Sequence, residues 1–177
     1  MPVIGAVVLA AGSGTRFGGP KQQLLIEPVL ERLRASPVDE IVVVIGAHPL
    51  EASTRTVFCP DWQLGPGASL RCGLAALPAR AEAAVVVLAD GPGLDPRAVE
   101  RVISAWRDGG GSVLAASYDG ERSHPVLLGR EVWPLIPEEG ARELTATLVP
   151  CHDLDPPGDV DFADDLRGRS TPQPAES

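Results

Sequence analysis

A glycine-rich segment near the start of the chain carries residue types that suit a phosphorylated ligand. Gly12–Lys21 (GSGTRFGGPK) combines four glycines with Arg16 and Lys21, and it follows an apolar run. Glycines let successive backbone N–H groups turn toward one point, which makes a nest for an anion. Arg16 offers a planar fork to phosphate oxygens, and Lys21 offers a compact positive charge. The alternative interpretation is an ordinary glycine-rich turn with two solvated cations.

The spacing of these glycines excludes two common phosphate-binding loops. A dinucleotide fingerprint needs glycine at its first, third and sixth positions, and the sixth position counted from Gly12 is Phe17. In a Walker A loop a glycine directly precedes the lysine. Gly14 and Gly19 have the right separation for that loop, but Pro20 stands between Gly19 and the lysine. The ability to bind an anion depends on neither pattern.

The elements that would position this segment are strands and helices in alternation. Uninterrupted apolar runs predict strands buried on both faces of a parallel sheet. These runs are Val3–Ala10, Ile41–Ile45 and Ala84–Ala89, and weaker strand patterns lie at Thr56–Cys59, Val113–Ser117 and Val126–Leu128. Helices are predicted over Pro28–Ala35, Pro49–Thr56, Ser69–Leu77 (with Ser69 as the N-cap) and Asp95–Trp106 (with Asp95 as the cap). The alternation predicts an α/β fold, a Rossmann-like, three-layer, doubly wound and mostly parallel sheet.

In such a sheet the ligand lies beyond the carboxyl ends of the strands. This rule singles out the segments that follow Ala10, Ile45 and Ala89. The first of these is the glycine-rich segment, and the third is Asp90–Gly93. Asp90 is therefore a candidate functional carboxylate, or else it caps the segment that follows it.

Composition limits the class of protein. The 177 residues, 44% of them hydrophobic, suit a full core, and we expect one domain over residues 1–168 with a flexible tail over residues 169–177. A net charge of −9 argues against general binding to nucleic acid or an anionic membrane. Three cysteines without a CxxC pair predict neither a disulfide framework nor a zinc site. The N-terminal residues lack signal-peptide features, so we expect a cytoplasmic protein.

The segment Leu9–Lys21 resembles the signature of the MobA-like nucleotidyltransferases, within the wider group of NTP-dependent nucleotidyl- and sugar-phosphate transferases. That signature places LA(A/G)G before a small-residue turn, an arginine and a lysine. The resemblance extends over residues 3–166 and implies the fold of the nucleotide-diphospho-sugar transferases. Further segments resemble family motifs in the expected order: Gly67–Leu74 (Ser-Leu-Arg-x-Gly-Leu), Leu88–Leu94 (Asp-x-Pro-x-Leu), Ser123–Leu128 (Gly-His-Pro-Val), Glu139–Arg142 (Gly-Ala-Arg) and Gly158–Leu166 (an acidic closing motif).

The resemblance implies nucleotidyl transfer, in which a phosphate on the acceptor attacks the α-phosphorus of a nucleoside triphosphate and pyrophosphate leaves. Such an enzyme mainly positions groups and neutralises developing charge. Arg16 and Lys21 would hold the triphosphate and stabilise the leaving pyrophosphate. Ala11, where the guanylyl branch usually has glycine, favours CTP over GTP. The nucleotide would lie against Leu9, Ala10, Ala11, Gly12, Ser13, Gly14, Ser69 and Arg71.

Asp90 is the implied catalytic carboxylate and the first ligand of Mg²⁺, a hard cation that takes few carboxylates and keeps phosphate and water at its other positions. Asp161 is the implied second metal ligand. An acidic surface loop is the alternative interpretation of its surroundings. Other acidic residues there compete for the role: Asp153, Asp155, Asp159, Asp164 and Asp165.

The Gly-His-Pro-Val and Gly-Ala-Arg segments resemble the branch that makes the dinucleotide form of the molybdenum cofactor, so the implied acceptor is molybdopterin. His124 would contact the pterin or its phosphate, unless it is a hydrogen-bonded histidine at a strand edge. Arg142 would bind the acceptor phosphate, or else pair with Glu138 or Glu139. A molybdoenzyme or its chaperone is the implied protein partner.

Two other functions stay open at this point. A shared nucleotide site does not fix the acceptor, so methylerythritol phosphate or a sugar phosphate could replace molybdopterin. The chain could also be a non-catalytic nucleotide-binding chaperone or regulator of a molybdoenzyme. The short intervals 22–40 and 46–57 motivate this second alternative, and Ser123 and Phe162 depart from the family pattern at the acceptor side.

Overall fold

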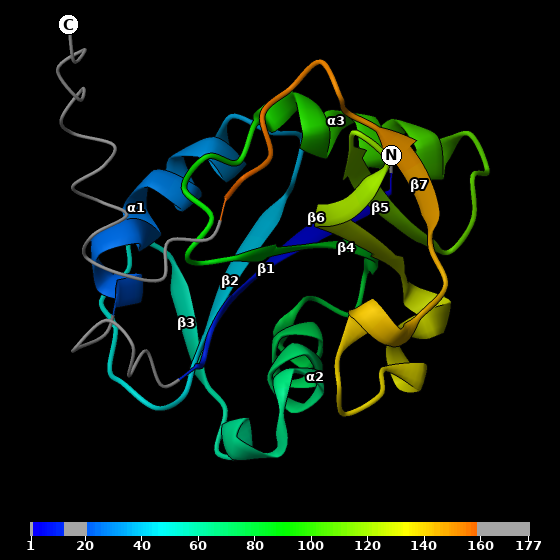
Figure 1. Ribbon diagram of the computed structural model, residues 1–177. Coiled ribbons are helices and arrows are strands. Elements are labelled where there is room, and N and C mark those ends of the chain that lie inside the picture. Colours follow the sequence, from blue (N-terminus) through cyan, green and yellow to red (C-terminus); the bar gives the residue numbers. More distant parts are fainter. Residues whose placement is uncertain (1, 13–20, 159–177) are drawn as a thin grey trace, which may run out of the picture.

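The computed structural model describes residues 2–12 and 21–158. Within them one sheet contains the strands β1 (Val3–Ala10), β2 (Glu40–Ile45), β3 (Arg55–Phe58), β4 (Ala81–Leu88), β5 (Val113–Tyr118), β6 (Glu121–Gly129) and β7 (Thr147–Pro150). Their order is β3-β2-β1-β4-β6-β5-β7 (Figure 1). The first four strands in this order pair in parallel, β6 runs antiparallel to both β4 and β5, and β7 is parallel to β5. The predicted α/β, mostly parallel sheet is confirmed.

Helices cover both faces of this sheet. α1 (Lys21–Arg34) and α3 (Pro96–Arg107) pack on one face, and α2 (Pro66–Ala76) packs on the other (Figure 1). Side chains of a strand alternate between the two faces. In β1, Ile4 and Val8 therefore enter the core beneath α1 and α3, while Val7 enters the core beneath α2. Because both faces are buried, the strand reads as an uninterrupted apolar run.

Two helices begin earlier than their sequence patterns predict. α1 begins at Lys21 and carries Pro28 inside it, because Leu25 and Ile26 already pack into the core ahead of the proline. α2 begins at Pro66, so the prediction that Ser69 is its N-cap is wrong, and Ser69 is buried within the helix. The prediction for α3 is confirmed, since the Asp95 carboxylate accepts a hydrogen bond from the backbone N–H of Arg97 (2.9 Å).

The predicted helix Pro49–Thr56 does not form. Side chains of α1 satisfy the backbone of this segment instead. The Gln23 amide donates to the carbonyl of Glu51 (3.0 Å) and accepts from its N–H (2.9 Å), and the Glu27 carboxylate accepts from the N–H of Ser53 (2.8 Å). These bonds hold the segment in an irregular conformation until β3 begins at Arg55.

The antiparallel part of the sheet is larger than its pattern predicts. β6 extends back to Glu121 and joins β5 through a tight turn, in which Asp119 and Gly120 both have positive φ (54° and 84°). Two central residues with positive φ are typical of a type I′ hairpin turn. The remaining elements are short 3-10 turns, η2 (Trp62–Leu64), η3 (Arg130–Leu135) and η4 (Ala141–Glu143).

The prediction that the cysteines form no disulfide framework is wrong for one pair. Cys59, directly after β3, forms a disulfide with Cys72 of α2, and Cys151 is a buried free thiol. The odd cysteine count gave no sign of this pairing, because strand order and helix packing bring the two residues together. In the part of the chain that the structure describes, every helix is too short or too polar to cross a membrane.

Candidate active site

Two adjoining cavities open at the carboxyl ends of β1 and β4. We call the first, of about 380 Å³, the loop cavity, because Gly12 and the residues around η2 line it. We call the second, of about 480 Å³, the hairpin cavity, because β6 and the chain around η4 line it. Leu9, Pro66 and Leu88 line both cavities. The two spaces therefore share a boundary made by the ends of two parallel strands and the first residue of α2.

The loop cavity gathers several of the residues predicted to hold a nucleotide. Ala11 and Gly12 extend from β1, Ser69 comes from the first turns of α2, and Asp90 follows β4. Ala10 is buried in the core between the sheet and the α1–α3 layer. The predictions for Ser13, Gly14 and Arg16 lie outside the described residues, as does the side chain of Lys21, which begins α1.

Asp90 stands where the backbone leaves the sheet. The N–H of Ala89 still donates to the carbonyl of Leu9 (3.0 Å), which keeps β4 against β1 up to the residue before Asp90. One oxygen of the Asp90 carboxylate is buried. The alternative interpretation of Asp90 is a cap for the segment that follows, but the cap of the next helix, α3, is Asp95. Asp90 therefore presents a carboxylate at the edge of the loop cavity.

A divalent cation suits this position chemically. Hard cations prefer oxygen ligands, and Mg²⁺ is commonly held by one or two carboxylates together with substrate phosphates. Among residues 2–12 and 21–158 no three metal-ligating side chains gather in one place, so Asp90 would act there with ligands from the nucleotide or the rest of the chain. The prediction for Asp161 lies outside the described residues. Gly158, three positions earlier, lies beside Gly91, since a Cβ on Gly91 would be 3.3 Å from the Gly158 carbonyl.

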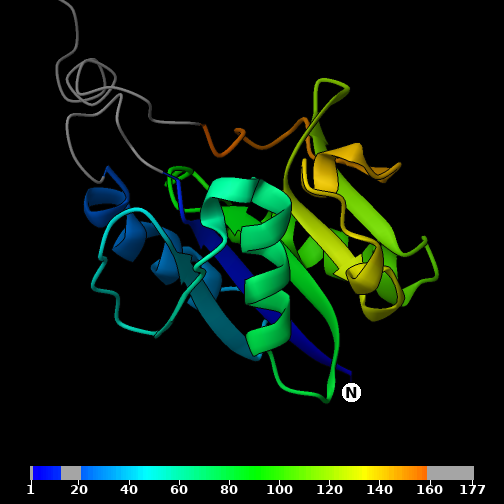
Figure 2. The ribbon, with the colours of Figure 1, turned by 90° about the horizontal axis from the view of Figure 1, so that it is seen from below.

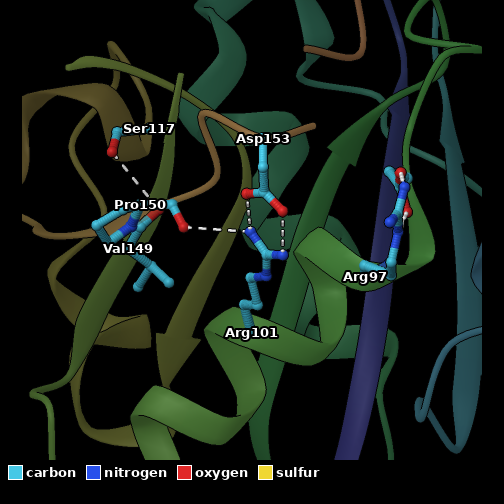
Figure 3. Close-up of polar contacts among 7 residues, drawn as sticks. Arg97, Arg101, Ser117, Val149, Pro150 and Asp153 are labelled. Carbon is cyan, nitrogen blue, oxygen red and sulfur yellow. Dashed lines mark hydrogen bonds and ion pairs between the residues drawn. The ribbon is translucent and has the colours of Figure 1, made fainter. Parts of the chain in front are cut away.

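The chain that leads to Gly158 is fastened to α3. The guanidinium of Arg101 donates two hydrogen bonds to the carboxylate of Asp153 (2.6 and 2.7 Å) and one to the carbonyl of Pro150 (3.4 Å), as Figure 3 shows. The hydrogen bonds from Arg101 hold the pKa of Asp153 well below its usual range. Farther on, the N–H of Gly93 donates to the carbonyl of Pro157 (3.1 Å). Asp153, one of the competitors of Asp161, is thus occupied by an ion pair.

His124 lies in β6, and the charges of Asp90 and Arg122 both act on its imidazole. It is half-buried and lines the hairpin cavity. Desolvation lowers the pKa of His124 to about 4, the charge of Asp90 opposes this shift, and the charge of Arg122 adds to it. The imidazole is therefore neutral at neutral pH. The Tyr118 hydroxyl donates to the His124 carbonyl (2.9 Å), and the His124–Pro125 peptide bond is cis.

The arginines predicted for the site have different positions. Arg142 is exposed and lies at the rim of the hairpin cavity. Its Nε is 3.8 Å from Oε1 of Glu143, so its ion pair is with Glu143 rather than with Glu138 or Glu139. Arg71 is half-buried and its guanidinium donates to the carbonyl of Ile136 (2.6 Å). Its atoms are part of neither cavity lining.

Sequence reasoning missed several residues that line the cavities. Trp62 and Gln63 of η2 lie in the loop cavity, and Arg122 lies in the hairpin cavity. Gly46 gives a partial signal for Trp62, because a Cβ on Gly46 would be 2.6 Å from the indole Cγ. Glycine at that position leaves room for the ring beside the end of β2. Arg122 gave no such signal, since its partners lie about twenty residues farther along the chain.

A doubly wound sheet with a glycine-bearing strand end, a carboxylate after a neighbouring strand and two adjoining cavities is typical of a nucleotide-binding protein of the α/β class. The chain belongs to the MobA-like NTP transferase domain family, whose pattern matches residues 6–150. It is a nucleotidyltransferase of that family.

Individual relatives are similar to this chain in sequence or in structure and differ in name. The nicotine blue oxidoreductase of Paenarthrobacter nicotinovorans is 32% identical over 163 residues, which cover 84% of this chain and 78% of that protein. A crystal structure of the Mycobacterium sp. strain JC1 homologue of Rv0371c is 27% identical, with 93% of each chain covered and a TM-score of 0.76. Rv0371c of Mycobacterium tuberculosis, in a complex with manganese, is 25% identical with a TM-score of 0.72, over 93% of this chain and 96% of that one.

Proposed function

We propose that this protein transfers CMP from CTP to the phosphate of molybdopterin, with Mg²⁺ as the metal and pyrophosphate as the second product. The observation that carries the proposal is the pair of adjoining cavities with Asp90 at the edge of one and His124 in the other. A reaction between two phosphorylated molecules needs two binding spaces that meet at one point. Here the shared boundary of Leu9, Pro66 and Leu88 is that meeting point.

The lining of the hairpin cavity supports an acceptor that combines a flat ring with an anionic group. Leu70, Val86 and Val126 form an apolar floor, and the charged residues of the lining are Arg122, Arg142 and Glu139, which leaves positive charge in excess. A polyhydroxylated sugar phosphate would leave hydroxyl groups against this floor without partners, which is costly when they are desolvated. A flat pterin ring can lay its face on this floor while its polar edge turns toward Ser123 and His124 of the same lining. The lining therefore favours molybdopterin over methylerythritol phosphate or a sugar phosphate.

The loop cavity supports CTP as the donor. Ala11 lies in its wall and is itself buried, and the carbonyl of Ala11 accepts from the N–H of Ala47 (3.3 Å), which fixes this part of the wall. The guanylyl branch of the family usually has glycine at this position, so the alanine of this chain favours a cytidylyl donor.

In the proposed reaction a phosphate oxygen of molybdopterin forms a bond to the α-phosphorus of CTP. The bond from that phosphorus to the bridging oxygen breaks, and the pyrophosphate leaves with the electron pair. The charge that accumulates on the phosphates is met by Arg16 and Lys21. Bound Mg²⁺ supplies further neutralisation and would be held by Asp90 and Asp161. The three residues from Gly158 to Asp161 span up to about 10 Å when extended, enough to bring a second carboxylate toward Asp90.

His124 would act as a neutral hydrogen-bonding group toward the acceptor, because its pKa of about 4 leaves it uncharged at neutral pH. A neutral imidazole can donate from one nitrogen and accept at the other. This suits the mixed donor and acceptor edge of a pterin. The product would then pass to a molybdoenzyme or its chaperone as the protein partner.

An oxidoreductase function is a second candidate, favoured by the name of the 32% identical relative from Paenarthrobacter nicotinovorans. Against it stands Phe17 at the position where a dinucleotide fingerprint requires its last glycine. Loss of NADH or NADPH absorbance in the presence of the protein and a dye acceptor would support this candidate. No loss is expected.

The decisive assay measures pyrophosphate release with Mg²⁺ and either CTP or GTP, with and without molybdopterin. Release is expected with CTP when molybdopterin is present, and the nucleotide product should carry the pterin. Release with methylerythritol phosphate or a sugar phosphate instead would replace the acceptor. Measurable CTP binding without release, for every acceptor tested, would favour the non-catalytic chaperone.

A further inference from the structure

One wall of the hairpin cavity is an irregular segment. Residues 136–144, which we call the strap, connect η3 to the chain before β7 and contribute Glu139, Gly140, Ala141 and Arg142 to the lining. Apart from the short turn η4, the strap has no regular structure. Its internal bonds are local turns, such as Gly140 N–H to the carbonyl of Pro137 (3.0 Å) and Leu144 N–H to that of Ala141 (3.0 Å). Its position therefore depends on bonds from neighbouring elements.

Those bonds come from both sides. From α2, the Arg71 guanidinium donates to the carbonyl of Ile136 (2.6 Å), and the N–H of Gly67 donates to the carbonyl of Glu138 (2.8 Å). From β6, the Arg122 guanidinium donates to the carbonyls of Leu144 (2.6 Å) and Ala141 (2.9 Å). Figure 2 shows α2 and the chain that contains the strap on the same side of the sheet. The strap is thus held at its start by one arginine and at its end by another.

The two arginines are suited to this work. A hydrogen bond from a charged donor to a carbonyl is stronger than one between neutral groups. Arg71 is half-buried and reaches the strap from the helix that also supplies Ser69 to the loop cavity. The guanidinium points to the strap, and the residue is absent from the lining of both cavities.

We propose that Arg71 and Arg122 are positioning residues for the acceptor, which set the wall of the hairpin cavity by holding the two ends of the strap. For Arg71 this replaces the nucleotide contact that its sequence position suggests. Only the kinetic prediction of this inference rests on the proposed function. The structural part, control of the strap, is independent of the reaction.

The kinetic test compares Arg71→Met, Arg71→Lys and Arg55→Met. Arg55 is the matched control, because it is an exposed arginine whose guanidinium donates to the carbonyl of Ala76 (2.8 Å) at the far end of the same helix. Arg71→Met is expected to raise the KM for molybdopterin about tenfold, the effect of losing one charged hydrogen bond, and to leave the KM for CTP within about twofold. Arg71→Lys should recover part of the loss, and Arg55→Met should change neither constant. A rise in the KM for CTP alone would make Arg71 a nucleotide contact and overturn the proposal.

A second readout does not require turnover. Hydrogen exchange at the amides of Gly140, Glu143 and Leu144 reports the local turns of the strap. Faster exchange at these amides is expected in Arg71→Met and in Arg122→Met, and unchanged exchange in Arg55→Met. If no acceptor reacts but exchange rises in this pattern, the proposed function fails and the positioning role stands. Unchanged strap exchange in both variants, in folded protein, would overturn the role.

Discussion

The loop cavity and the hairpin cavity share a boundary but are built in different ways. The loop cavity is formed where parallel strands end. Its carboxylate, Asp90, and its glycine, Gly12, each lie two residues after the end of a strand, β4 and β1 respectively. The wall of the hairpin cavity is the strap, which is held by side chains donating to backbone carbonyls across 65, 22 and 19 residues. Strand ends are fixed by the hydrogen-bond ladder of the sheet, whereas the strap is fixed by a few long-range bonds. We expect mutations to affect the two halves in correspondingly different ways.

The largest effect is expected from Asp90→Asn. The change keeps the shape of the side chain and removes the charge that would hold Mg²⁺, so kcat should fall by about 10³-fold, the scale observed when one preorganised electrostatic group is removed. CTP binding, measured by calorimetry without metal, should persist. The KM for molybdopterin should change little, because Asp90 lies outside the lining of the hairpin cavity.

Asp95→Asn is the matched control for this prediction. Asp95 caps α3 five residues later in the same chain segment and forms an ion pair with Arg97 (2.8 Å). Asn is itself a good N-cap, so the variant should fold and keep kcat close to that of the wild type. If Asp90→Asn kept more than a tenth of the wild-type kcat, the carboxylate would have no role in the chemical step.

Removal of the disulfide should affect the loop cavity more than the hairpin cavity. The Cys59–Cys72 bond closes a loop that contains Trp62, Gln63 and Ser69, all of which line the loop cavity. The two residues are 13 positions apart, and in the chain-entropy model closing a loop of this length stabilises the fold by about 3 kcal/mol. The double variant Cys59→Ser/Cys72→Ser should unfold at lower urea concentration and show a raised KM for CTP.

The remaining thiol supplies the control. Cys151→Ser changes a buried cysteine outside both cavity linings, so any loss of stability should leave the KM for CTP unchanged. Equal KM values for CTP in the double variant and the wild type would mean that β3 and α2 hold the wall of the loop cavity without the covalent link.

The same division separates what could be predicted from sequence and what could not. β1, α3 with its Asp95 cap, and the position of Asp90 after a buried strand follow from local patterns, namely apolar runs and an Asp-Pro helix start. The hairpin between β5 and β6 also had a local signal, the Asp119-Gly120 dipeptide, which favours positive φ at both positions. The apolar run alone predicts only Val126–Leu128 as a strand, whereas β6 begins at Glu121 directly after this dipeptide.

Other features had no local signal. The irregular segment before β3 depends on Gln23 and Glu27, which lie in a helix more than twenty residues earlier. The contacts of Arg71 and Arg122 depend on how η3 and η4 fold back over α2, and the family motif suggested a nucleotide contact for Arg71 instead. The pairing of Cys59 with Cys72 depends on the distance between a strand end and a helix. The number of cysteines in a sequence gives no information about that distance.

Gly67→Ala should disturb the hairpin cavity from the side of α2. A Cβ at this position would fall on the carbonyl oxygen of Pro137 and lie 2.8 Å from the Cα of Glu138, so the strap has to move away. We expect a loss of about 1–3 kcal/mol of stability, typical of overpacking, and a raised KM for molybdopterin, measured beside urea unfolding. Gly73→Ala is the control, since its Cβ would meet side chains of Val7 and Val44 beneath the helix. An equal rise of the acceptor KM in both variants would contradict the specific role of the strap.

The smallest effect concerns the protonation of His124. Its pKa is about 4 in the folded protein, because burial disfavours the charged form, and about 6.5 in the unfolded chain. Between these values the unfolded state binds more protons, so the free energy of unfolding decreases as the pH falls from about 6.5 to 4, and this contribution is constant at higher pH. His124→Asn should remove that part of the pH dependence, measured as urea midpoints at pH 7, 5.5 and 4.5, while His152→Asn, at an exposed position, should retain it. If His124→Asn and the wild type lost stability equally on acidification, the imidazole would be charged in the folded state, and it would then meet the acceptor phosphate as a cation alongside Arg142 rather than as a neutral partner of the pterin.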